Sequence, residues 1–151
     1  MAILVNKVQI TDEEIGREMQ YHPAPSQEQA WHMAAQSLVI RQLLLQQAAS
    51  NGLCGDIGIV APPEHEEELI DQLLEHDVSV PDADEATCQR FYDNHPDSFK
   101  ADNASERVTF EHAHPNIRDY LHTKAMRIAV AEYIKALSYS AEIKGFELDS
   151  L

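Results

Sequence analysis

The chain has 151 residues, and 26 acidic against 11 basic side chains give it a formal net charge of −15. This length fits one domain, and 44% apolar residues are enough for a core, which argues against a disordered acidic tail. A duplex-binding protein or a protein on an anionic membrane needs a basic face, so we expect no nucleic-acid partner and no membrane partner.

The two cysteines and the N-terminal sequence bear on the compartment. Cys54 and Cys88 are far apart without CxxC spacing, which suits a reducing compartment. A single disulfide bond between them remains the alternative. The first residues carry no basic leader, and the most apolar run, residues 30–40, is interrupted by polar side chains. We therefore expect a soluble, cytoplasmic protein.

The N-terminal part predicts a strand and a short helix. Residues 3–10 are rich in β-branched side chains and alternate loosely, which indicates one short strand. Thr11 and Glu14 have the spacing of a capping box, so a helix follows them. This helix must stop near Tyr21, because the His-Pro-Ala-Pro run at 22–25 cannot continue it.

The next helix is predicted to be the central one. Ser26 and Gln29 repeat the capping chemistry, and Gly52 is a natural residue for the position after the helix end. Apolar residues cover a wide arc of the segment between them, which is typical of a helix packed between neighbours. Pro63 then begins a third helix, with glutamates placed well for the N-terminal dipole.

The second half of the chain predicts two more helices and short strands. Asp82 and Glu85 start a fourth helix that ends before the His-Pro at 95–96. We expect a loop over 100–107, a short strand at 108–110 and a possible terminal strand at 146–148. The longest helix is expected to follow Pro115 and to stop at Gly145. The predicted fold class is mostly α, about five helices with a small sheet from the chain ends.

Four segments together resemble a known family. They are VNKVQITDEEIGREM, LVIRQLLLQQAASNGL, VSVPDADEATCQRFYDNHPDSF and IRDYLHTKAMRIAVAEYIKALSYSAEIKGFEL. In this order they resemble the chaperone part of parvulin-type foldases, which include the periplasmic survival chaperones and the nitrogenase-maturation and nitrate-reductase-linked parvulins. The resemblance implies a helical chaperone module like the N-terminal module of SurA.

The chain departs from this family where the isomerase domain would be inserted. Only residues 100–116 stand there, whereas four strands alone need roughly 20 residues. The parvulin domain is therefore absent, and prolyl isomerase activity is not expected. We interpret residues 1–151 as a single chaperone-like domain in which 100–116 form a short linker.

Methionine and aromatic side chains are the candidates for binding a client. Methionine adapts to irregular partners, and aromatic rings supply contact area at low entropy cost. The alternative is that each of these side chains belongs to the core, and exposure of a contiguous apolar patch would discriminate the two. The candidates are Met19, Trp31, Met33, Tyr92 and Met126.

The histidines give only weak candidates for a metal site. His112, His114 and His122 lie near acidic residues, but their separations are not the i, i+4 pair that places two imidazoles on one helical face. The alternative is that they are solvated histidines on an acidic surface. There is no GxSxG motif and no phosphate-binding glycine loop, so we expect no enzyme activity and no cofactor.

These observations lead to one functional hypothesis and two alternatives. The hypothesis is a non-catalytic chaperone or assembly factor that holds an apolar segment of a client, and the resemblance points to a metalloenzyme subunit. The high negative charge would attract a basic client. The alternatives are a small metal-binding or delivery protein and a permanent structural subunit of a complex. A homodimer formed by exchange of N-terminal elements is also expected.

Overall fold

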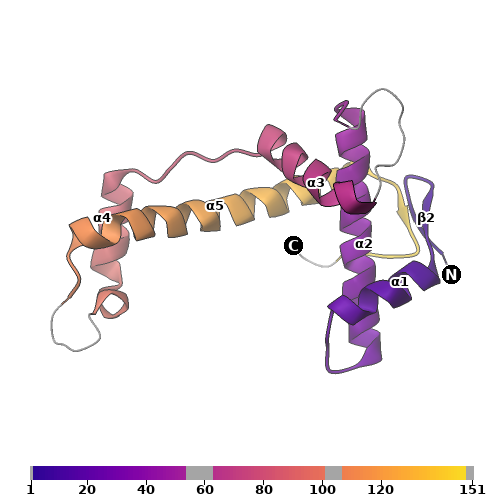
Figure 1. Ribbon diagram of the computed structural model, residues 1–151, viewed down its shortest axis with the longest axis horizontal. Coiled ribbons are helices and arrows are strands. Elements are labelled where there is room, and N and C mark those ends of the chain that lie inside the picture. Colours follow the sequence, from indigo (N-terminus) through magenta and orange to yellow (C-terminus); the bar gives the residue numbers. More distant parts are fainter. Residues whose placement is uncertain (1, 54–62, 101–106, 149–151) are drawn as a thin grey trace. The chain divides into compact units, whose positions relative to one another are not determined.

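A computed structural model describes residues 2–53, 63–100 and 107–148 of the chain (Figure 1). The fold is mostly α with a small sheet from the chain ends, as predicted. Within the described residues the elements are β1 (Ile3–Val5), β2 (Val8–Ile10), α1 (Asp12–Glu18), η1 (Met19–Tyr21), α2 (Gln27–Ser50), α3 (Pro63–Asp77), α4 (Glu85–Asn94), η2 (Pro96–Phe99), α5 (Phe110–Ser140) and β3 (Ile143–Lys144).

The chain folds into two compact units, and α5 contributes to both. The first unit comprises Met1–Val78 and Val130–Leu151, and the second comprises Ser79–Ala129. No helix in the described part of the chain is long and apolar enough to cross a membrane. Cys88 is a buried free thiol whose pKa burial raises, whereas Cys54 lies outside the described residues.

The first strand prediction was wrong, because residues 3–10 form a hairpin of two strands. β1 and β2 pair antiparallel with Ile3 opposite Ile10 and Val5 opposite Val8. The two residues between the strands, Asn6 and Lys7, both have positive φ, 48° and 72°. Two such residues make the tight turn whose twist matches a hairpin. Asparagine adopts this conformation readily, but lysine does so rarely.

The third strand comes from the other end of the chain and pairs with the opposite edge of β1. β3 lies at Ile143–Lys144, so the strand predicted at 146–148 is wrong. Asn6 fixes this pairing, because its N–H donates to the carbonyl oxygen of Glu142 and its Oδ1 accepts from the N–H of Glu142, both at 2.8 Å. The sheet, in the order β2-β1-β3, is therefore complete within one chain. The exchange of N-terminal elements between two copies stays a prediction.

The helix boundaries of the N-terminal part follow the capping signals in the sequence. Thr11 and Glu14 form the complete capping box of α1, and the Ser26 Oγ accepts from the N–H of Gln29 at the start of α2. At the end of α2 the N–H groups of Gly52 and Leu53 donate to Ala49 and Ala48, both at 3.0 Å. This is a Schellman motif, and its glycine has φ +78°, as such a motif requires.

Helix α2 is the axis of the first unit and carries two core clusters along its length (Figure 1). Its N-terminal half packs on α1 and the sheet, and the buried residues there are Ile3, Val5, Ile10, Ile15, Ala34, Ala35, Val39 and Leu43. Its C-terminal half packs on α3 and on the end of α5, and the buried residues there are Leu44, Ala48, Leu73 and Ile134. A helix covered on several sides explains why apolar residues occupy so wide an arc of α2.

Asp77 joins the ends of three helices beside the second core cluster. Its Oδ2 accepts hydrogen bonds from the Tyr133 hydroxyl at 2.5 Å and from the Asn51 Nδ2 at 3.0 Å, while the Nδ1 of His76 lies 2.5 Å from its Oδ1. The hydrogen bond from Tyr133, followed by that from His76, lowers the pKa of Asp77. Burial and the same carboxylate raise the pKa of Tyr133, so the hydroxyl remains the donor.

Replacing Asp77 with asparagine should lower the melting temperature most at neutral pH. A carboxyl group whose pKa is lowered by folding stabilises the native state above its ordinary pKa, and this contribution disappears as the pH falls through the lower folded value. The wild type and D77N should therefore converge below about pH 4. Thermal unfolding by circular dichroism between neutral and acidic pH measures this. D71N removes an exposed carboxylate from the same helix and should show a smaller difference at neutral pH.

The second unit has its own core between α4 and the first turns of α5. Its buried residues are Cys88, Tyr92, Ala113 and Ile117. The Tyr92 hydroxyl donates to the carbonyl oxygen of Val108, and the guanidinium of Arg107 lies 3.7 Å above its ring. The Oδ1 of Asp84 accepts from the N–H of Thr87 at 2.8 Å and caps α4, so Asp84 and not Asp82 starts this helix.

The predicted start of the last helix was also wrong. Phe110 begins α5, so the strand predicted at 108–110 is absent there and Pro115 stands inside the helix. Proline lacks the N–H of an i→i−4 hydrogen bond, which usually breaks a helix. Here the turn that precedes Pro115 carries Phe110 and Ala113, which pack on the core of the second unit. This burial offsets the missing hydrogen bond. The helix ends at Ser140, before Gly145.

Candidate functional site

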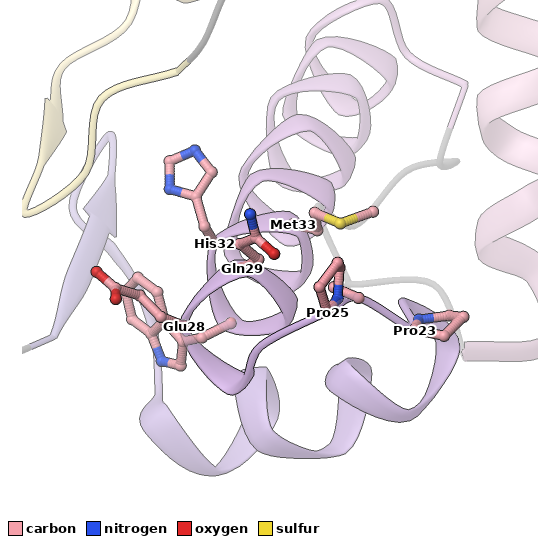
Figure 2. A pocket seen from close by; sticks show the side chains of 8 residues that line it. Pro23, Pro25, Glu28, Gln29, His32 and Met33 are labelled. Carbon is pink, nitrogen blue, oxygen red and sulfur yellow. The ribbon is translucent and has the colours of Figure 1, made fainter.

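The described part of the chain has an apolar pocket at the start of α2 (Figure 2). Its volume is about 600 Å³, and we call it the α2 pocket. Small-molecule and side-chain sites in proteins span about 300–1,000 Å³, so this volume admits several apolar side chains. The residues that line it are Pro23, Ala24, Pro25, Glu28, Gln29, Trp31, His32 and Met33.

A rigid turn between η1 and α2 forms one wall of the pocket. Proline fixes φ, so Pro23 and Pro25 restrict the backbone of this turn up to the Ser26 cap. Glu18 anchors the turn, because its Oε1 lies 3.1 Å from the Nε2 of His22 and accepts from the Oγ of Ser37 at 3.5 Å. The Glu18 side chain is only 13% exposed, so this link between α1 and α2 is shielded from water. The proline wall is therefore fixed before any ligand arrives.

The C-terminal segment supports the pocket from behind. The Phe146 ring lies 6.3 Å from the Trp31 ring and 5.0 Å from the His32 ring, measured between centroids. Gly145 directs the chain to this position with a φ of +82°. Trp31 thus lines the pocket and also packs against the first core cluster. Its orientation depends on a segment more than a hundred residues away in the sequence.

Met33 is an exposed, large apolar side chain of the pocket. It is 45% exposed, and Figure 2 shows it on the same side of the pocket as Pro25, with Gln29 between Met33 and His32. Polar groups accompany this apolar surface, because Glu28, Gln29 and His32 also line the pocket. An apolar lining with a few polar groups at its edge is the usual composition of a binding pocket.

The five client-binding candidates are divided between the two units. Trp31 and Met33 both line the pocket, and Met19, like Trp31, packs against the first core cluster. Tyr92 and Met126 belong to the second unit. Tyr92 is 9% exposed and contributes to that unit's core, which corrects its prediction as a binding residue. Met126 is half-buried.

The three histidines considered for a metal site lie apart from one another. His112 is exposed, His114 stacks on Phe110 at 4.9 Å between centroids, and the Nδ1 of His122 lies 3.1 Å from Asp82. Across residues 2–53, 63–100 and 107–148, no three His, Cys, Asp or Glu side chains converge as metal ligands. The described residues therefore offer no metal site that would support the metal-delivery alternative.

Six of the eight residues that line the pocket are not among the binding residues predicted from the sequence. Pro23 and Pro25 are predicted only to end a helix, and Glu28 and His32 have no predicted role. The signal that could have revealed the pocket is the Pro-Ala-Pro run. A stiff segment directly before a capped helix leaves a recess between itself and the first turns of that helix. The chain matches no protein-family model, no curated protein and no solved structure.

Proposed function

We propose that this protein is a non-catalytic chaperone or assembly factor that holds an apolar segment of a client in the α2 pocket. The observation that carries the proposal is an apolar pocket of about 600 Å³ whose lining includes Trp31 and the exposed Met33. Methionine adjusts to side chains of different shape, which a binder of varied apolar segments needs. Binding the unfolded or unassembled client lowers its free concentration and so suppresses its aggregation.

The charge of the chain favours a client segment with basic residues beside its apolar ones. Glu28 is the acidic side chain that lines the pocket, and the whole chain carries −15. A negative electrostatic field increases the rate at which the protein encounters a cationic segment. This rate enhancement falls as the ionic strength rises. The same charge keeps a complex with an apolar client in solution.

The resemblance to the chaperone part of parvulin-type foldases supports the same proposal. It favours a client that is a subunit of a multi-subunit metalloenzyme, and the absence of CxxC spacing favours action in the cytoplasm. A permanent structural subunit would bind with fixed stoichiometry and would not release its partner, whereas we propose reversible holding.

The test is suppression of aggregation when a denatured model enzyme is diluted into buffer, followed by light scattering. We expect the wild type to suppress scattering and Met33→Ser to need about fivefold more protein for the same effect, as for a contact residue worth about 1 kcal/mol. Tyr139→Ser is the matched control, because Tyr139 is 78% exposed on α5 and does not line the pocket. Equal activity of the two variants, or no suppression by the wild type, would contradict the proposal.

A further inference from the structure

One face of α5 in the second unit is covered over its first turns and then continues uncovered. Ala113 and Ile117 on this face are 4% and 2% exposed against α4. Leu121 follows half-buried, and Lys124 and Ile128 continue the same helical row at spacings of three and four residues. Ile128 is 56% exposed. Beside the row, Tyr120 is 53% exposed although its ring contacts Phe91.

The uncovered part of this face has the opposite charge to the rest of the chain. We call it the α5 open face, and it consists of Tyr120, Lys124, Arg127 and Ile128. Helical spacing places Asn116 and Thr123 beside these residues, and the nearest carboxylates in the helix are Asp119, which precedes Tyr120, and Glu132, which follows Ile128 by one turn. No ion pair joins Lys124 or Arg127 to a carboxylate of the described residues, although the chain has 26 acidic side chains.

We propose that the α5 open face docks an acidic amphipathic helix of another protein. The helical form follows from continuity, because α4 already packs as a helix on the preceding turns of the same face. The apolar side of the partner would cover Ile128 and the exposed part of Tyr120. Its carboxylates would pair with Lys124 and Arg127, and partly buried pairs of this kind set orientation and partner choice. This inference does not rest on the function proposed for the α2 pocket.

The charges argue against two other occupants. A second copy that used the same face would bring Lys124 and Arg127 against their own counterparts, because a two-fold interface is self-complementary. A nucleic acid would be repelled by a chain of net charge −15 that offers only two cations on this face. An acidic helix gains from both cations and needs only a short contact.

The experiment uses the full chain and a fluorescein-labelled helical peptide with leucines on one face and glutamates on the other. A matched peptide has glutamine in place of every glutamate. We expect anisotropy to report binding of the glutamate peptide, at least about tenfold weaker binding of the glutamine peptide, and a similar loss for K124E/R127E. Raising NaCl from about 50 to about 500 mM should weaken binding of the glutamate peptide.

Two control variants separate the α5 open face from net charge and from the α2 pocket. R17E/K144E makes the same change in net charge in the first unit and should bind the peptide within about twofold of the wild type. Met33→Ser should bind it like the wild type, so failure of the pocket proposal leaves this one intact. Lys124 and Arg127 are exposed, so we expect K124E/R127E to fold like the wild type, and thermal melts of all variants check this.

Four outcomes would overturn the inference. One is equal affinity for the glutamate and glutamine peptides, and another is unchanged binding by K124E/R127E. The third is a dimer of the wild type in light scattering that K124E/R127E abolishes, because a second copy would then occupy the face. Preferential binding of a single-stranded oligonucleotide over the glutamate peptide would likewise contradict a protein partner.

Discussion

Replacing Leu73 with alanine is expected to lower the free energy of unfolding by about 2–5 kcal/mol. Leu73 is 0% exposed at the centre of the second core cluster, where α3 meets α2 and the end of α5. Alanine would leave a cavity that these helices cannot fill without moving. Since a domain of this size is stable by only about 5–15 kcal/mol, the loss would be a large fraction of the total.

Chemical denaturation followed by circular dichroism measures this loss. The matched control is Gln72→Ala, which changes the exposed neighbour on the same helix and should stay within about 0.5 kcal/mol of the wild type. Because the cluster belongs to the first unit, the second unit should keep its own transition if the two units unfold separately. A loss below about 1 kcal/mol for L73A would show that α3 does not pack on α2 as described.

Gly145→Ala should destabilise the first unit and also disturb the α2 pocket. A Cβ atom at this position would lie 2.8 Å from the carbonyl oxygen of Ala2, and the backbone φ is +82°. The left-handed conformation alone costs about 1–2 kcal/mol for alanine, and the collision with a backbone atom adds to that. Relief of the collision requires the segment with Phe146 to move away from Trp31 and His32.

Trp31 is the chain's single tryptophan, so its fluorescence reports this movement directly. We expect G145A to shift the emission to longer wavelength and to lower the melting temperature. Gly16→Ala is the matched control, because Gly16 lies in α1 with no atom within 4 Å of the added Cβ. That change should stabilise the protein by about 0.5–1 kcal/mol, since alanine favours a helix interior. Identical spectra of G145A and the wild type would contradict the role given to Phe146.

Local signals in the sequence were sufficient for most helix boundaries. Thr11, Ser26 and Pro63 begin helices and Gly52 follows one, because a capping group acts on backbone atoms within four residues of itself. The mostly α fold followed from these signals together with apolar periodicity. Such features depend only on neighbours in the chain, which a sequence displays directly.

Features that depend on distant contacts escaped prediction. The turn at Asn6–Lys7 lacks the usual glycine, and it is held by hydrogen bonds to Glu142 at the other end of the chain. Pro115 remains inside α5 because the turn before it is buried against α4. Strand β3 has only two residues, and these form a strand only because they pair with β1. None of these partners is visible from local spacing.

The candidate site was predictable in part for the same reason. Trp31 and Met33 stand out by residue type, but burial decides which aromatic side chain is available to a partner, and Tyr92 is buried by contacts with Phe99 and Phe110. The remaining wall of the pocket depends on Phe146, which the sequence places far from α2. Residue type identified candidates, and only tertiary contacts separated the exposed side chains from those in the core.

The discontinuity of the first unit has a consequence for the order of folding during synthesis. Ser79–Ala129 is continuous and can acquire its contacts as soon as it leaves the ribosome. The sheet cannot close until residues 143–144 have been made, so the hairpin of residues 3–10 waits with one edge of β1 unpaired. Contacts over so long a stretch of chain form slowly, and the waiting edge is where a nascent chain would aggregate or recruit a chaperone.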